Sequence, residues 1–102
     1  MILIGRVMDR ITFNMSKVLS AHTNLPEAGA VMYKSLVDAI LSHNVLVVDM
    51  MEVTSLPSIF LNVSVGKAID EYGKEELKKH LTFTNITRLQ ASRIKEYMSR
   101  YN

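Results

Sequence analysis

The 102-residue sequence has no cysteine, no tryptophan, four glycines and two prolines. The absence of cysteine excludes thiol catalysis, thiolate metal sites and redox switching, and it fits a reducing cytoplasm. No stretch approaches the roughly 18 apolar residues of a membrane span. Arg6, Asp9 and Arg10 interrupt the apolar start before a signal-peptide core could form. With no repeat or low-complexity segment either, we expect residues 1–102 to form one cytoplasmic domain that contacts no membrane.

The charge is weakly positive and unevenly distributed. Residues 1–66 contain four Lys/Arg and five Asp/Glu, and residues 67–102 contain eight and five, so the parts carry −1 and +3 of a formal +2. This bias is far below the dense basic stripe of a nucleic-acid-binding protein, and we expect nucleic acid not to be the ligand. The alternative is a small-nucleotide or nucleic-acid binding module that uses Lys78, Lys79, Arg88 and Arg93.

The unbroken apolar run Val45–Val48, which ends on Asp49, is the most informative segment of the chain. Such a run is typical of a buried parallel strand, because covering both faces removes the alternation of apolar and polar residues. A polar turn then leads into a helix predicted over 56–72, with Ser55 as N-cap and Gly73 as the stop. Sites in open α/β sheets lie where strand C-termini meet helix N-termini, so we expect the function at this turn.

The remaining patterns predict the elements around that strand. Asn24 and Pro26 begin a helix over 26–42 whose apolar residues form one stripe. Alternation and capping signals predict the others: a hairpin of the strands Ile2–Met8 and Lys17–Ala21, with Ile11–Phe13 in the first strand or the turn, a short helix Lys74–His80, a strand Leu81–Thr84 and a helix over 87–101 capped by Asn85 or Thr87. This order predicts an α/β fold with a mixed sheet of about four strands and helices mainly on one face.

No pattern in the sequence is typical of catalysis. Serine, histidine and aspartate all occur, but there is neither a Gly-x-Ser-x-Gly elbow nor a glycine-rich phosphate loop. His22, His43 and His80 are far apart in the sequence, which argues against a zinc site. We therefore expect no enzyme activity, no metal and no cofactor.

The turn after the central strand holds the candidate site. Asp49 either contacts a partner or accepts hydrogen bonds from turn amides near 52–54. Ser58 either favours a phosphate at the first turn of the helix or is a neutral first-turn residue. The helix also has more apolar residues than one core-facing stripe requires, so its first two turns are either deeply buried or partly exposed as a contact surface. The candidate docking residues are Asp49, Thr54, Ser55, Ser58, Ile59, Phe60 and Leu61, and Ser58 is also the candidate for phosphorylation.

Three segments carry a family resemblance: Leu46–Val53, Ser58–Leu61 and, above all, Glu71–Asn85. Through them the chain resembles the bacterial STAS-like domains, a family of unknown function related to the anti-anti-sigma factors, over about residues 24–102. In the anti-anti-sigma relatives, a kinase of the histidine-kinase-like ATPase type phosphorylates the first serine of an Asp-Ser-Ser-Gly motif. When residues 57–60 are laid on that motif, only Ser58 agrees.

The resemblance and the turn together lead to one functional hypothesis. It is a cytoplasmic, non-enzymatic STAS-like regulatory module in signalling, which docks a protein partner through the loop and helix start at 54–63. The resemblance implies a histidine-kinase-like ATPase or another regulator as the partner. Ile59, Phe60 and Leu61 would be the anchors if they are exposed, because apolar side chains at an interface centre carry most of the binding energy. Homodimerisation is a third alternative.

Overall fold

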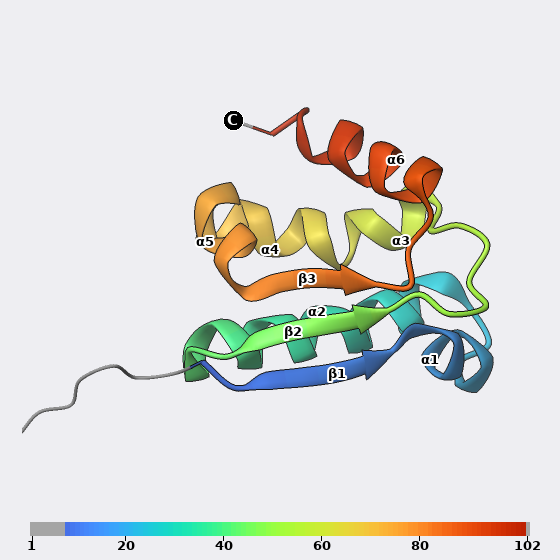
Figure 1. The fold of residues 1–102 in the computed structure, drawn as a ribbon, viewed down its shortest axis with the longest axis horizontal. Coiled ribbons are helices and arrows are strands. Elements are labelled where there is room, and N and C mark those ends of the chain that lie inside the picture. The colour runs from blue at the N-terminus through green and yellow to red at the C-terminus, as the bar shows by residue number, and fades with distance from the viewer. Residues whose placement is uncertain (1–7, 102) are drawn as a thin grey trace, which may run out of the picture.

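The computed structural model describes residues 8–101, which fold into a three-stranded sheet with helices packed against it (Figure 1). The strands are β1 (Arg10–Asn14), β2 (Val45–Asp49) and β3 (Leu81–Thr84). The helices are α1 (Met15–Ala21), α2 (Leu25–Ser42), α3 (Ser58–Asn62), α4 (Val65–Tyr72), α5 (Lys74–His80) and α6 (Arg88–Met98). All strands are parallel and lie in the order β1-β2-β3. The predicted α/β class is therefore confirmed, with β2 in the centre.

β2 lies between β1 and β3. The helices before β2 and those after it return the chain to the same end of the sheet, as parallel pairing requires. Val48 lies opposite Phe13 of β1 and Phe83 of β3, and it is fully buried. Met32 and Leu36 of α2 join the same core cluster. In Figure 1, α2 lies behind β1 and β2, and α3 and α4 lie above β3 in this view. The predicted buried strand at Val45–Asp49 thus brings the chain to the edge of the sheet where the next loop begins.

The predicted N-terminal hairpin is wrong. Lys17–Ala21 lies in α1 rather than in a strand, and β1 pairs in parallel with β2. The helix begins here because the Asn14 side chain accepts a hydrogen bond of 3.0 Å from the Lys17 amide, which is an N-cap. The fully buried Met15 starts the inward face of α1, and Val18 and Leu19 continue it at i+3 and i+4. The sheet of residues 8–101 consequently has three strands, and it is parallel rather than mixed. Ile11–Phe13 lies in its first strand. Residues 2–7 of the predicted hairpin lie outside the described residues.

The single helix predicted over 56–72 is also wrong, because the structure divides it into α3 and α4. The break falls at Val63 and Ser64. The backbone angles of Ser64 (φ −122°, ψ −86°) are not helical. The buried Ser64 hydroxyl donates to the Phe60 carbonyl at 2.8 Å, which satisfies a group that the break leaves free. Pro57, rather than Ser55, occupies the N-cap position of α3. The segment 50–57 is therefore a loop that lies between β2 and a short helix.

The remaining elements follow the sequence closely, although α6 ends at Met98 rather than at 101. α5 and β3 have the predicted bounds, and α2 begins where the Asn24 side chain accepts from the Glu27 amide at 2.8 Å. Thr87, rather than Asn85, caps α6 in a reciprocal box with Gln90. Among residues 8–101, no helix is both long enough and apolar enough to cross a membrane.

Candidate functional site

The site begins at the carboxyl ends of β2 and β3, where Asp49 holds two segments together. Its Oδ1 accepts a hydrogen bond from Asn85 Nδ2 at 2.9 Å and one from the Met51 amide at 3.0 Å. The hydrogen bond from Asn85, and to a smaller extent that from the Met51 amide, holds the pKa of Asp49 below its ordinary value. The bond to the Met51 amide is an Asx turn just before the predicted 52–54 amides. Asp49 therefore shapes the loop from which the next side chains project.

Gln90 of α6 fixes the middle of that loop. Its buried side chain donates from Nε2 to the Val53 carbonyl at 2.6 Å and to the Thr54 carbonyl at 2.8 Å. Its Oε1 accepts from the Thr87 amide at 2.9 Å, which closes the capping box. One side chain thus caps α6 and places the loop beside it, although the two segments are more than thirty residues apart in the sequence.

A groove of about 580 Å³ lies between this loop and α6, and we call it the loop–α6 groove. Its loop side includes Thr54, Ser55 and Ser58. Its α6 side shows residues at helical spacing, which are Leu89, Arg93, Glu96 and Arg100. Since these positions are i, i+4, i+7 and i+11, they lie along one face of the helix and its C-terminal continuation. The groove therefore combines small hydroxyl groups, two guanidinium groups and one carboxylate with several apolar side chains, among them Leu89, Leu56, Leu61 and Ile94.

The structure separates the predicted docking residues into two groups. Thr54, Ser55 and Ser58 are exposed, and Ile59 is 53% exposed on α3. Phe60 and Leu61 do not meet the condition of exposure under which they would be anchors. Phe60 is 0% exposed and Leu61 is 5% exposed, because α3 turns both side chains into the core against α2. The apolar excess noted in the sequence mostly fills the core.

The exposed apolar side chains near the loop are different ones. Met51 is 55% exposed on the loop, and Leu89 is 61% exposed at the start of α6. Sequence reasoning missed Leu89 because α6 was considered for its inward face and its basic charge only. The spacing of Leu89, Arg93 and Arg100 was the signal that could have found this surface.

α6 is held beside α3 and α4 by its tyrosines. The Tyr97 hydroxyl donates to Asn62 Oδ1 at 2.7 Å and lies 3.0 Å from the Tyr101 hydroxyl. Burial raises the pKa of Tyr97 well above its ordinary value. The two hydroxyls lie over Gly66 of α4, where a Cβ atom would come within 2.5 Å of each. The absence of a side chain at Gly66 therefore allows α6 to approach α4.

The predicted basic residues do not form one cluster of unpaired charges. Lys78 lies 3.8 Å from Glu75, and Lys79 lies 3.7 Å from Glu76. Arg93 lines the loop–α6 groove instead. His80 is buried, with Nδ1 2.7 Å from the Asn44 carbonyl and Nε2 3.1 Å from Glu76 Oε2, which ties α5 to the turn before β2. The nucleic-acid alternative stays a prediction that these contacts do not strengthen.

Metal binding finds no support in the side chains that the structure describes. Within residues 8–101 there is no group of three or more His, Asp or Glu side chains that could hold a metal ion. The rings of His43 and His80 lie with their centroids 6.5 Å apart, and His22 is 3.7 Å from Glu27. His43 and His80 are therefore neighbouring rings, whereas His22 lies beside Glu27.

The comparison with known families agrees with this architecture. The family described as STAS-like domain of unknown function (DUF4325) matches residues 28–89, from the first turn of α2 to the first turn of α6. The chain belongs to this family of STAS-like domains. No curated protein and no solved structure matches the chain. The family match covers β2, the loop and α3, but it ends before Arg93 and Arg100.

Proposed function

We propose that the chain is a non-enzymatic module that binds a regulatory protein through the loop–α6 groove. One observation carries this proposal: exposed Leu89 and the guanidinium groups of Arg93 and Arg100 line the same groove as the hydroxyl groups of the loop. An apolar anchor with flanking arginines is a composition that protein interfaces favour. The partner segment that fits is apolar at one position and acidic beside it, since carboxylates bind arginine through paired hydrogen bonds.

The scaffold supports such a role because the groove walls are fixed before any partner arrives. Gln90 joins the loop to α6, Asp49 joins the loop to the end of β3, and Tyr97 joins α6 to Asn62. A preorganised surface loses little conformational entropy when it binds. The resemblance to anti-anti-sigma relatives suggests a histidine-kinase-like ATPase as the partner class, in a bacterial signalling pathway of the cytoplasm. Ser58 lies at the rim of this groove, and its phosphorylation belongs to the same proposal.

The experiment is site-specific photo-crosslinking in the native host. A photoreactive amino acid replaces Ser55, which is exposed and lines the groove, or Leu41, which is 64% exposed near the C-terminal end of α2. Position 41 precedes β2, whereas the loop follows β2, so the two probes lie at opposite ends of the sheet. We expect one protein to be crosslinked from position 55 and not from position 41. Equal crosslinking from both positions, or crosslinking from position 41 alone, would refute the proposed surface.

A further inference from the structure

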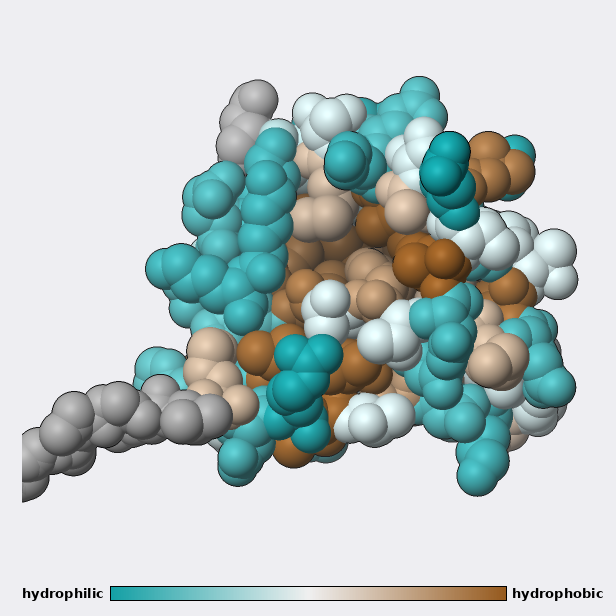
Figure 2. Space-filling view, viewed as in Figure 1, coloured by the Kyte–Doolittle hydropathy of each residue, from teal (hydrophilic) through white to brown (hydrophobic). Residues whose placement is uncertain are grey.

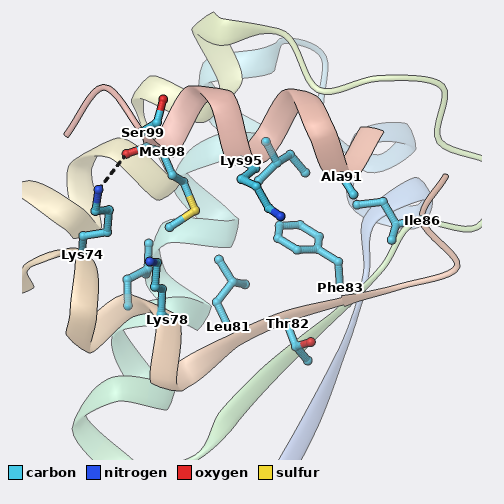
Figure 3. Close-up of a pocket in the computed structure, with 12 residues that line it drawn as sticks. Lys74, Lys78, Leu81, Thr82, Phe83, Ile86, Ala91, Lys95, Met98 and Ser99 are labelled. Carbon is cyan, nitrogen blue, oxygen red and sulfur yellow. Dashed lines mark hydrogen bonds between the residues drawn. The ribbon is translucent and has the colours of Figure 1, made fainter. Parts of the chain in front are cut away.

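A second cavity lies on the other side of α6 and is separate in character from the loop–α6 groove. It has a volume of about 540 Å³ and is a partly open cavity bordered by α5, β3 and α6; we call it the β3–α6 pocket. Figure 3 shows its lining, and Figure 2 shows a hydrophobic hollow bordered by hydrophilic side chains on this face of the molecule. The proposed partner site does not use this cavity.

The lining of the β3–α6 pocket is apolar inside and positively charged at the rim. Its apolar side chains come from all three elements and are Leu77, Leu81, Phe83, Ile86, Ala91, Ile94 and Met98. The charged side chains are Lys74, Lys78 and Lys95, and the lining contains no acidic side chain. A cavity of this size that is mostly apolar and has a few polar groups, here three lysines with Thr82 and Ser99, matches the usual form of a small-molecule site.

The three lysines differ in whether their ammonium groups already have a hydrogen-bond or ion-pair partner. Lys74 Nζ donates to the Tyr101 carbonyl at 2.7 Å and to the Met98 carbonyl at 3.5 Å, so it closes the C-terminal end of α6. Lys78 lies 3.8 Å from Glu75. Lys95 takes part in none of the ion pairs among residues 8–101. In Figure 3 the Lys95 side chain extends from α6 toward the ring of Phe83. Lys95 is therefore the cation that an anionic ligand would meet.

α6 forms the roof of the pocket and is fixed at both ends. Gln90 bonds it to the loop at one end, and Lys74 bonds its last turn at the other. A roof that is tied in this way keeps the pocket at a fixed width, which suits a slender flexible chain better than a folded partner. Taking about 30 Å³ for each water-sized group, the twelve heavy atoms of decanoate occupy about 360 Å³, which fits within the cavity.

We propose that the β3–α6 pocket binds a medium-chain carboxylate, with the apolar chain between β3 and α6 and the carboxylate beside Lys95. Burial of the chain supplies the affinity, because each methylene removed from water is favourable. The carboxylate stays at the rim, next to an exposed ammonium group, so it avoids the cost of a buried charge. This site is independent of the proposed partner site and can fail or succeed without it.

The test uses NMR titration of the ¹⁵N-labelled full chain with decanoate and with decanol, each below the concentration at which it aggregates. We expect saturable shifts of the amides at 81–86 and 91–99 with both probes. Lys95→Gln should weaken decanoate binding about fivefold, the size of a favourable exposed ion pair, and leave decanol binding unchanged. Lys17→Gln, at an exposed lysine of α1 outside both cavities, should change neither.

A steric pair of variants tests the position of the chain. Ala91 is exposed and lines the pocket, whereas its neighbour Ser92 is exposed and does not. Ala91→Phe should abolish binding of both probes, and Ser92→Phe should leave both unchanged. No saturable binding of decanoate, or shifts centred on 51–58, would overturn the proposal. Equal loss of decanoate and decanol in Lys95→Gln would also overturn it, because the anion would then not be recognised.

Discussion

Asn85 donates a hydrogen bond of 2.9 Å from Nδ2 to Oδ1 of Asp49, and this bond joins the ends of two neighbouring parallel strands. Asn85 itself has φ 52°, the left-handed conformation that asparagine adopts more readily than most residues. The bond fixes the position of the segment between β3 and α6 relative to the start of the loop after β2. Both walls of the loop–α6 groove depend on it.

Asp49 should make stability depend on pH in the acidic range. Because its folded-state pKa lies below the ordinary 3.8, the unfolded chain binds its proton more readily. The stabilisation is therefore present above the unfolded pKa and is lost as pH falls through the folded pKa. Asp49→Asn should lower the melting temperature at pH 7, and the difference from wild type should shrink between pH 4 and pH 2.

Asp9→Asn is the control, since Asp9 is exposed and has no side-chain hydrogen bond or ion pair within residues 8–101, whereas Asp49 is partly buried. It should show a smaller difference from wild type at pH 7. A constant difference between Asp49→Asn and wild type from pH 7 to pH 2 would contradict the role given to these hydrogen bonds.

Gln90 should control the position of the loop. Gln90→Ala leaves the Val53 carbonyl without its donor in a buried position, and such a loss costs about 1–3 kcal/mol. Urea unfolding should show this loss, and hydrogen exchange should become faster at 51–57. Ser92→Ala, on the exposed side of the same helix, should change neither quantity. Unchanged exchange in Gln90→Ala would mean that other contacts hold the loop.

Truncation of Leu61 and of Ile59 should lower stability by very different amounts. Leu61→Ala removes a core side chain and should cost about 2–5 kcal/mol in the free energy of unfolding. Ile59→Ala changes a side chain that is half exposed and should cost at most about 0.5 kcal/mol. Chemical denaturation of both variants measures the contrast, and similar losses would place Ile59 in the core.

The elements that sequence reasoning located correctly are those with local signals. The apolar run at Val45–Val48, the cap at Asn24 and the polar segment Lys74–His80 each determine their own structure. β1 was misjudged because its partner is β2, which lies about thirty residues away, and because the cap at Asn14 was not recognised. Tertiary pairing decided the sheet, and no local pattern could show it.

The candidate site was only half visible in the sequence for the same reason. The loop follows directly from a buried strand, so Thr54, Ser55 and Ser58 were found. The burial of Phe60 and Leu61 could not be decided from the sequence, because α3 is a separate short helix whose orientation depends on the break at Ser64. Leu89 was missed, and Arg93 was considered only as a basic residue for nucleic acid, because Gln90 brings α6 to the loop by a contact between distant segments.

Binding of the crosslinked partner by Leu89 and Leu41 variants tests the central claim most directly. The two leucines are 61% and 64% exposed, so aspartate at either position should leave the fold intact. Calorimetric titration of the purified partner should show at least about a tenfold weaker affinity for Leu89→Asp, as expected for an apolar anchor at an interface. Leu41→Asp should bind like wild type. Wild-type affinity of a folded Leu89→Asp variant would contradict the assignment of function to the loop–α6 groove.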